Sequence, residues 1–380
     1  MAINWYFSRT TLANKLAEDY TDLGKERIAM FANRQKGKTL FCLNDLMPAM
    51  KDRDYFPIYV DFWSNEEDPA MAFATGVAES YDLLSMRDKP LTLQSFKLST
   101  PKELGIIAEL GITSERPELT MSAADDAISH LLKYAEYKPV FIVLDEVQHL
   151  ATSKKFESFV AKLRSFLINK AQRCKHPIKA LFIGSDQARL ADLFKSSKAP
   201  FYKATDVADF PDLGKAFTDF TVTNYESRMG VASLNRDEAY KMFSDGGKMP
   251  GSFTGLLKEM VSTDRNDLQN SATELGYFAN VAENYREHLR KVKAQDVAIL
   301  ILLARDIDNI YVQKSLDMIG ILSRKSKVTA SSVQGSIRKL EGRGLVITKG
   351  HGVWEIADSA MKAWLLENTA EIKDLLSLDS

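Results

Sequence analysis

The sequence predicts an α/β fold: a parallel sheet with helical crossovers, followed by a mostly helical segment and a small module of helices and strands. In the first 210 residues, short apolar runs alternate with amphipathic stretches, which is the pattern of parallel strands joined by helices. Beyond residue 211 helical periodicity dominates, until two short strand-like runs appear near the C-terminus. The strand candidates of the first part are residues 27–32, 57–63, 139–146 and 178–184.

The elements between these runs follow from their spacing. The unbroken apolar run at 140–144 is typical of a strand covered on both faces. Residues 153–169 carry apolar side chains at helical spacing, which predicts a helix that packs on the sheet. A long insert occupies residues 66–138, and within it we expect a small hairpin followed by a helix from Ser122.

Composition excludes several classes of protein. The 50 basic and 51 acidic side chains nearly cancel, so any surface for nucleic acid must be local. Neither Cys42 nor Cys174 lies in a CxxC pair and the five histidines form no HExxH, so we expect neither a disulfide framework nor a zinc site. A reducing cytoplasm fits this usage. We expect no signal peptide, because the N-terminal segment carries charges where a signal peptide needs its apolar core. We also expect no membrane span, because the longest apolar run near the C-terminus covers only residues 297–304.

We expect three domains. Residues 1–210 form the α/β domain that contains the insert, and residues 211–290 form a small helical lid. Residues 291–380 read as three helices, two short strands and a last helix. Helix, helix, helix and hairpin is the order of a winged-helix domain.

A phosphate-binding loop is predicted where the first strand meets a helix. The loop ends in Gly37, Lys38 and Thr39, as in the GxxxxGK[ST] pattern, whose backbone N–H groups wrap phosphates. Lys38 then reaches the β- and γ-phosphates and Thr39 holds a magnesium ion. The first glycine of the pattern is Ala32 here, which restricts the backbone. The alternative is a surface turn with a solvated lysine. The predicted nucleotide contacts are Ala32, Asn33, Arg34, Gln35, Lys36, Gly37, Lys38, Thr39 and Leu40.

Acidic residues follow the third strand candidate. A buried parallel strand delivers the carboxylates of Asp145 and Glu146 to the edge of the sheet where phosphates sit. Asp145 binds magnesium through water in this reading, and Glu146 polarises the attacking water. Ordinary solvated acids at a strand end are the alternative. Ser185, after the fourth strand, either hydrogen-bonds the γ-phosphate or the water, or caps the next helix. Asp61, after the second strand, is a candidate to restrain Glu146.

With these motifs the first 260 or so residues resemble an AAA+ ATPase of the origin-recognition, archaeal-type and STAND group. Residues 32–39 correspond to its Walker A motif, residues 141–146 to its Walker B motif, and Ser185 to its first sensor. The resemblance implies a P-loop NTPase sheet with a helical lid, and initiator-like members also carry a C-terminal winged helix. It implies ATP or ADP and Mg²⁺ as cofactors.

Three further assignments rest on the same resemblance. Phe7 and Arg9 resemble the family's N-terminal box, which implies that they hold the adenine; packing of an N-terminal helix is the alternative. Arg189 is the candidate arginine finger that a neighbouring subunit of a homo-oligomer donates, or else a local ion-pair partner. The second sensor departs from the family, because Lys248 stands where an arginine is usual, and lysine offers no fork. This departure predicts hydrolysis that is slow or that depends on a partner.

The C-terminal module carries a local basic surface. Residues 321–351 hold seven lysines and arginines against the single acid Glu341, a local charge of +6. A winged helix places its third helix in the major groove and its wing on the backbone, so cations there meet phosphates. Polar side chains of the third helix, such as Gln334 and Ser336, are candidates to contact bases. A protein-interaction module is the alternative. The predicted DNA-binding residues are Lys325, Lys327, Arg338, Lys339, Arg343 and Lys349.

Three functions remain open from the sequence. The first is Mg-ATP hydrolysis coupled to DNA binding through the winged helix. The second is a STAND-like nucleotide-gated signalling switch with little turnover, which acts through a protein partner. The third is a transcription regulator whose ATPase domain is vestigial. The fold alone does not choose the biological process among replication, transposition, plasmid maintenance and phage defence.

Overall fold

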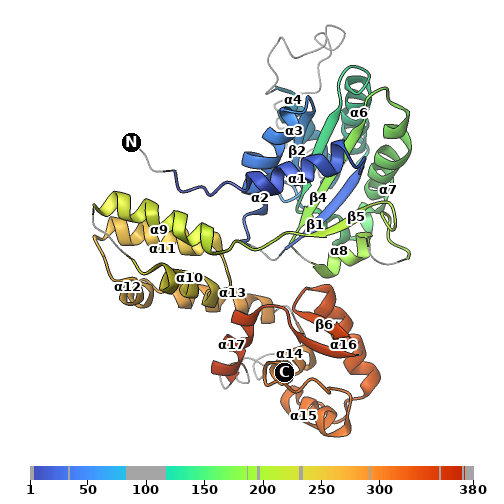
Figure 1. Cartoon of the computed structure of the whole chain (residues 1–380). Coiled ribbons are helices and arrows are strands. Elements are labelled where there is room, and N and C mark those ends of the chain that lie inside the picture. Colours follow the sequence, from blue (N-terminus) through green and yellow to red (C-terminus); the bar gives the residue numbers. More distant parts are fainter. Residues whose placement is uncertain are drawn as a thin grey trace. The chain divides into compact units, whose positions relative to one another are not determined.

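This computed structural model describes residues 4–32, 35–82, 117–185, 187–194, 197–230, 234–290, 292–350, 352–369 and 372. The chain divides into two compact units (Figure 1). The sheet unit consists of Ser8–Ala32 and Lys38–Phe210. The helical unit consists of Met1–Phe7, Asn33–Gly37 and Pro211–Ser380.

The sheet unit contains the predicted parallel sheet. Over the described residues its strands run in the order β2-β3-β4-β1-β5, and every neighbouring pair is parallel. The α/β prediction and all four strand candidates are thereby confirmed. The sequence reasoning missed β5 at the edge beside β1. The strands are β1 (Arg27–Phe31), β2 (Phe56–Asp61), β3 (Val140–Asp145), β4 (Ile178–Gly184) and β5 (Asp206–Asp209).

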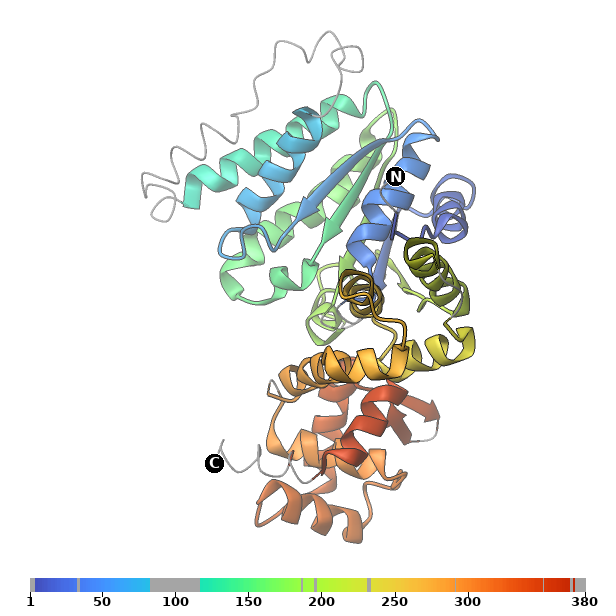
Figure 2. The ribbon, with the colours of Figure 1, turned by 90° about the vertical axis from the view of Figure 1, so that its left-hand side faces the viewer.

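Helices cover both faces of this sheet (Figure 2). Successive side chains of a strand point to opposite faces. Ile142 and Leu144 accordingly pack in the cluster that contains side chains of α4, α6 and α7, whereas Phe141 and Val143 pack with α1 and the helical stretch after β1. Burial on both faces explains why the sequence of β3 is an unbroken apolar run.

The helices of the sheet unit are α1 (Thr10–Thr21), α2 (Lys38–Phe41), η1 (Cys42–Leu46), α3 (Met47–Lys51), α4 (Pro69–Asp82), α6 (Pro117–Tyr134), η2 (Val147–Ala151), η3 (Lys154–Phe156), α7 (Glu157–Ser165), η4 (Phe166–Lys170), η5 (Ala171–Arg173) and α8 (Gln187–Phe194). The helix expected from Ser122 begins at Pro117. The hairpin expected in the insert falls within residues 83–116, outside the described residues.

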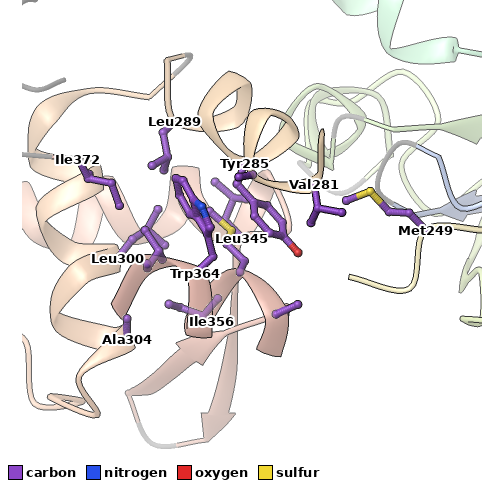
Figure 3. Packing of buried hydrophobic residues seen from close by; sticks show 14 of the residues in the cluster. Met249, Val281, Tyr285, Leu289, Leu300, Ala304, Leu345, Ile356, Trp364 and Ile372 are labelled. Carbon is purple, nitrogen blue, oxygen red and sulfur yellow. The ribbon is translucent and has the colours of Figure 1, made fainter. Parts of the chain in front are cut away.

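The helical unit has its own hydrophobic core. Helix α14 is buried along its whole length, because residues from both the preceding and the following helices pack around it. Figure 3 shows Tyr285, Leu300, Ile356 and Trp364 in this core. The elements are α9 (Lys215–Met229), α10 (Arg236–Asp245), α11 (Pro250–Ser262), α12 (Leu268–Glu274), α13 (Tyr277–Arg290), α14 (Ala294–Ala304), α15 (Gln313–Ser323), α16 (Ala330–Gly342), β6 (Val346–Gly350), β7 (Val353–Ile356) and α17 (Ser359–Glu367).

Local capping explains where several of these helices begin. Asn235 accepts hydrogen bonds from two backbone N–H groups at the start of α10, and Asp358 does the same for α17. Thr329 forms a capping box with Ser332 at α16. Pro250 occupies the first turn of α11, where no hydrogen-bonded N–H is lost.

The order of elements after residue 290 is three helices, the antiparallel pair β6 and β7, and α17. This is the predicted order, while the winged-helix assignment and the domain boundary near residue 290 stay predictions. In the part of the chain that the structure describes, no helix is both long and apolar enough to span a membrane.

Candidate functional site

The parallel sheet collects the predicted motif residues at one edge. Strands β3 and β4 end at Asp145 and Gly184, so Glu146 and Ser185 follow at their carboxyl ends. Strand β1 lies beside β4 and leads through the loop to Lys38, the first residue of α2. Because carboxyl ends of parallel strands meet at the same edge, residues distant in sequence become neighbours there.

Asp145 is the centre of this edge. Its Oδ2 accepts a hydrogen bond of 2.7 Å from Thr39 Oγ1 and one of 2.8 Å from the hydroxyl of Tyr59. Its Oδ1 accepts a third, from the backbone N–H of Glu146, at 2.8 Å. The residue is 1% exposed. The structure thus joins two motifs that lie more than one hundred positions apart in the sequence.

Burial raises the pKa of the Asp145 carboxyl, and the hydrogen bonds from Thr39 and Tyr59 oppose that rise because they stabilise the carboxylate. The pKa of Tyr59 is raised far above its usual value, first by burial and then by the charge of Asp145. Tyr59 therefore stays protonated and remains a hydrogen-bond donor. Sequence reasoning missed Tyr59, since a tyrosine inside an apolar strand reads as core.

The donor set fits magnesium. Thr39 and Asp145 present a hydroxyl and a carboxylate oxygen 2.7 Å apart, and Mg²⁺ prefers oxygen ligands. The described residues contain no group of three or more His, Cys, Asp or Glu side chains placed to hold a metal ion. Magnesium sites that use one or two carboxylates together with substrate phosphates and water need no such group.

Lys38 joins the two ends of the predicted phosphate loop. Its Nζ donates a hydrogen bond of 2.7 Å to the carbonyl oxygen of Ala32, and the residue is 6% exposed. A charged donor gains more from a phosphate oxygen than from a neutral carbonyl, so the position of Lys38 Nζ at the loop suits an anionic ligand. Leu40, also in the predicted contact list, is 54% exposed.

Glu146, Gln148 and Ser185 form a second polar cluster at the same edge. Glu146 adopts the left-handed backbone region at φ 54°. Its Oε2 accepts hydrogen bonds from Gln148 Nε2 and, at 3.2 Å, from Ser185 Oγ. Sequence reasoning missed Gln148, because a lone glutamine after an acidic pair carries no periodic signal. Asp61, proposed to restrain Glu146, instead accepts a 2.8 Å bond from the backbone N–H of Trp63.

The middle of the predicted phosphate loop belongs to the helical unit. Gly37 has φ 82°, which favours glycine, and Gln35 has φ 63°. Lys36 Nζ donates to the carbonyl oxygen of Gly247 at 2.8 Å and pairs with Asp212 Oδ1 at 2.8 Å. The Lys36 side chain is therefore engaged within the helical unit, and its predicted contact with a nucleotide stays a prediction.

The structure also places Gln35 and Lys248. Gln35 lines a pocket of about 500 Å³ with Gly251, Ser252, Asn280 and Glu283. Lys248 is the residue that stands where an arginine is usual. Its carbonyl oxygen accepts a hydrogen bond of 3.4 Å from Lys36 Nζ. Asn33 and Arg34 lie outside the described residues.

The predicted N-terminal box divides between the units. Arg9 places its guanidinium carbon 4.2 Å from the centre of the Phe210 ring, and its backbone N–H donates to Asp45 Oδ2 at 2.9 Å. In the helical unit, Phe7 packs edge-on against Phe217 and Phe220. These contacts give both residues a packing role, and their predicted part in holding adenine stays a prediction.

The basic residues of the C-terminal module have different surroundings. Arg338 and Lys339 are exposed on α16, and neither takes part in an ion pair among the described residues. Lys327 is exposed before this helix. Lys325 Nζ donates to Gln295 Oε1 at 2.7 Å, and Arg343 is the C-terminal cap residue of α16.

Two other polar groups of α16 serve the fold. Ser336 is buried and accepts a 3.1 Å bond from the amide of Gln295, so it is not available to bases. Ser332 is engaged in the capping box of α16. Gln334 remains exposed. The side chains of Arg189, in α8, and Lys349, in β6, lie outside the described part of the structure.

Comparison with known proteins gives a consistent result for the fold. Neither a protein-family model nor a curated protein sequence matches this chain. Among solved structures, a Walker-type ATPase of Pyrococcus abyssi is similar, with a TM-score of 0.62 and 14% identity over 95% of this chain and 96% of that one. The ORC2 protein of Aeropyrum pernix is similar in its ADPNP–ADP complexes, with a TM-score of 0.58 and 12% identity over 95% of this chain and 94% of that one.

The ADP form of the same Aeropyrum protein matches with a TM-score of 0.54 and 14% identity, over 97% of this chain and 95% of that one. At such identities the likeness concerns the fold. The loop between β1 and α2, the acidic end of β3 and the parallel strand order agree with it. The chain has the fold of the Pyrococcus Walker-type ATPase and of the Aeropyrum ORC2 protein.

Proposed function

We propose that this protein binds ATP with Mg²⁺ at the strand edge around Asp145 and hydrolyses it. The observation that carries the proposal is the 2.7 Å hydrogen bond between Thr39 and Asp145, which joins the end of the phosphate loop to the acidic end of β3. A hydroxyl and a carboxylate held together beside a buried lysine form a magnesium and phosphate site. The Aeropyrum ORC2 protein was crystallised with ADPNP and ADP, which supports nucleotide as the ligand class.

Each residue has a stated role in this proposal. Lys38 exchanges the Ala32 carbonyl for the β- and γ-phosphate oxygens. Thr39 and Asp145 hold Mg²⁺, which neutralises phosphate charge when bound. Glu146 accepts the proton of the attacking water. Ser185, whose hydroxyl donates to Glu146 in this structure, turns that single donor to the water or to the γ-phosphate when nucleotide is bound. Arg189 is our candidate for a group that acts on the site of a neighbouring copy.

The Mg²⁺-dependent gain in ATP affinity should fall as the solution becomes acidic. Protonated Asp145 cannot bind the cation, and burial raises the pKa of Asp145, so the loss begins at a higher pH than for an ordinary aspartate. Below that pKa the gain should shrink by about tenfold per pH unit. Titrations of fluorescent ATP with and without Mg²⁺, at several pH values, measure this gain. Asp145→Asn should abolish it at every pH, and a gain that survives in this variant contradicts the magnesium site.

We further propose that residues 291–380 form a winged-helix domain that binds DNA, and that residues 211–290 act as the lid. The exposed Arg338 and Lys339 on α16 support this, because unpaired cations on the third helix of such a domain face phosphates. Lys325, tied to Gln295, is better suited to hold the helices together.

Replacing Arg338 and Lys339 together by glutamine should weaken DNA binding and reduce its dependence on salt. Each lost phosphate contact makes the slope of log K against log salt concentration less steep by about 0.9. The slope of the double variant should therefore be less steep than that of the parent by roughly 1.8. Fluorescence anisotropy of labelled duplex DNA at several salt concentrations measures both effects. Lys15 and Lys51 are exposed cations of the sheet unit, and replacing both with glutamine is the matched control. If the slope of log K against log salt concentration is the same in the parent and the Arg338/Lys339 variant, these two residues do not contact DNA.

The STAND-like switch is the second candidate, and the contacts of Lys36 favour it. Because Lys36 binds Asp212 and the Gly247 carbonyl, the middle of the phosphate loop is tied to the turn before α11. These contacts suit a protein whose conformation depends on whether ATP or ADP is bound, rather than one that hydrolyses ATP rapidly. Steady-state ATP hydrolysis with and without DNA separates the two, since coupled sites show stimulation and a switch acting through a protein partner shows none.

A further inference from the structure

We infer that Gln148 is a positioning residue of this site: it holds the carboxylate of Glu146 and the hydroxyl of Ser185 in one arrangement, so that Glu146 meets the attacking water with a defined oxygen. This inference rests on the proposed ATP hydrolysis. It adds a residue that neither the loop motif nor the acidic motif contains. All three side chains belong to the sheet unit.

Gln148 joins the ends of two strands. Its Nε2 donates to Glu146 Oε2, after β3, and to Ser185 Oγ at 3.2 Å, after β4. Its Oε1 accepts from the backbone N–H of Ser185 at 3.3 Å. A carboxylate accepts only and a backbone N–H donates only, so these partners determine which end of the amide faces each of them. The amide is thus bound at both ends.

The surroundings leave Gln148 little freedom. The residue is 2% exposed, at the start of the short helix η2. A Cβ at position 184 would lie 2.5 Å from Gln148 Oε1 and 2.9 Å from Leu190, so only glycine at the end of β4 makes room for the amide. The left-handed backbone of Glu146, at φ 54°, turns the chain so that residues 146 and 148 face the same strand end.

This arrangement selects one oxygen of Glu146. Gln148 and Ser185 both donate to Oε2, and no other described residue hydrogen-bonds this carboxylate. Oε1 is therefore the atom left to accept a proton from water. A general base acts efficiently only when it is held within hydrogen-bond reach in a fixed orientation. Without Gln148, Glu146 loses one of its two donors and its carboxylate turns more freely.

A purely structural role would also bury Gln148, so the test must separate positioning from packing. Gln148→Met keeps the length and bulk of the side chain and removes all three hydrogen bonds of the amide. We expect it to lower kcat by roughly 10- to 100-fold while KM for ATP stays within about twofold. Gln148→Glu keeps Oε1 but replaces the donor that faces Glu146 by a carboxylate, and only its protonated form donates. The ratio of its kcat to that of the parent should rise as pH falls, whereas the ratio for Gln148→Met stays flat.

Gln172, exposed in η5 before β4 begins, provides the matched control, because Gln172→Glu makes the same charge change in the sheet unit, at the opposite end of β4 from Ser185. ATP hydrolysis is followed by phosphate release from about pH 5.5 to 8.5, because a neighbouring carboxylate raises the pKa of an introduced carboxyl group. Thermal unfolding identifies a variant that fails to fold. In that case the kcat ratio of Gln148→Glu, measured against pH, carries the test alone.

The outcomes are distinct. Turnover in the parent with an unchanged kcat in Gln148→Met overturns this inference and leaves the ATPase proposal standing. A pH-independent ratio for Gln148→Glu also overturns it, because packing defects do not titrate. A parent chain that neither binds nor hydrolyses ATP removes the proposed function, and the role of Gln148 with it.

Discussion

Lys38→Ala is expected to weaken ATP binding by about 10- to 100-fold and to reduce hydrolysis below detection. Lys38 is buried, and its ammonium group donates a hydrogen bond to the carbonyl oxygen of Ala32, where the loop begins. A hydrogen bond from a charged donor to a charged oxygen contributes about 1.5–3 kcal/mol, and each 1.4 kcal/mol corresponds to a factor of ten in Kd. Loss of transition-state charge stabilisation costs roughly 100- to 1,000-fold more in kcat.

Calorimetric ATP titration and phosphate-release assays measure both quantities. Lys51→Ala is the matched control, because Lys51 is an exposed lysine at the end of α3 in the same unit. Circular dichroism and thermal unfolding show whether the Lys38 variant is folded. A Lys38→Ala protein that binds and hydrolyses ATP as the parent does would end the phosphate-loop interpretation.

Glu146→Gln is expected to lower kcat by roughly 100- to 10,000-fold and to leave ATP affinity within about threefold of the parent. The amide has nearly the same shape as the carboxylate but cannot take a proton from water. Because Glu146 accepts hydrogen bonds from Gln148 and Ser185 and is not a proposed ligand of phosphate or magnesium, binding should survive. An interaction made only in the transition state affects kcat without affecting binding.

Single-turnover hydrolysis and equilibrium binding, measured on the same preparations, test this separation. Glu157→Gln, at an exposed position in the first turn of α7, makes the same change away from the site. Equal turnover in the parent and Glu146→Gln would assign the role of base to another group. Loss of binding in both the Lys38 and Glu146 variants would instead point to a common structural defect.

The sheet was predictable because its central strands are buried on both faces. Such strands must be apolar at every position, and β3 and β4 are the clearest runs in the first half of the chain. The edge strand β5 was missed, since Asp206–Asp209 pairs only with β1 and has an aspartate at each end. The other edge strand, β2, was predicted because its six residues are mostly apolar, whereas the four residues of β5 include two aspartates and carry little signal.

The motif residues of the site were predictable because each motif is local in sequence. A glycine, a lysine and a threonine in succession at a strand-to-helix turn, and two acids after an apolar run, have a chemical meaning without knowledge of the partner strand. Tyr59 and Gln148 have no such motif. Tyr59 reaches Asp145 because β2 lies beside β3, and Gln148 reaches Ser185 because β4 lies on the other side of β3.

The loop shows the limit of motif reasoning most clearly. The pattern indicates a phosphate contact at Lys36, but a motif describes the backbone path and not where each side chain finds its lowest energy. Lys36 is drawn to Asp212 and the Gly247 carbonyl, 176 or more positions later in the chain. The spacing between these groups in the sequence predicts nothing about that encounter.

By itself the amino-acid sequence determined strands β1 to β4, the order of helices and strands after residue 290 and the chemical type of each motif residue, because burial and backbone chemistry act over a few neighbouring residues. Only the tertiary structure decided which groups share a hydrogen bond: Thr39 with Asp145, Gln148 with Ser185, Lys36 with Asp212. Those choices depend on strand order and on the packing of distant segments, and the free energy of a hydrogen bond depends on the atoms that meet in space.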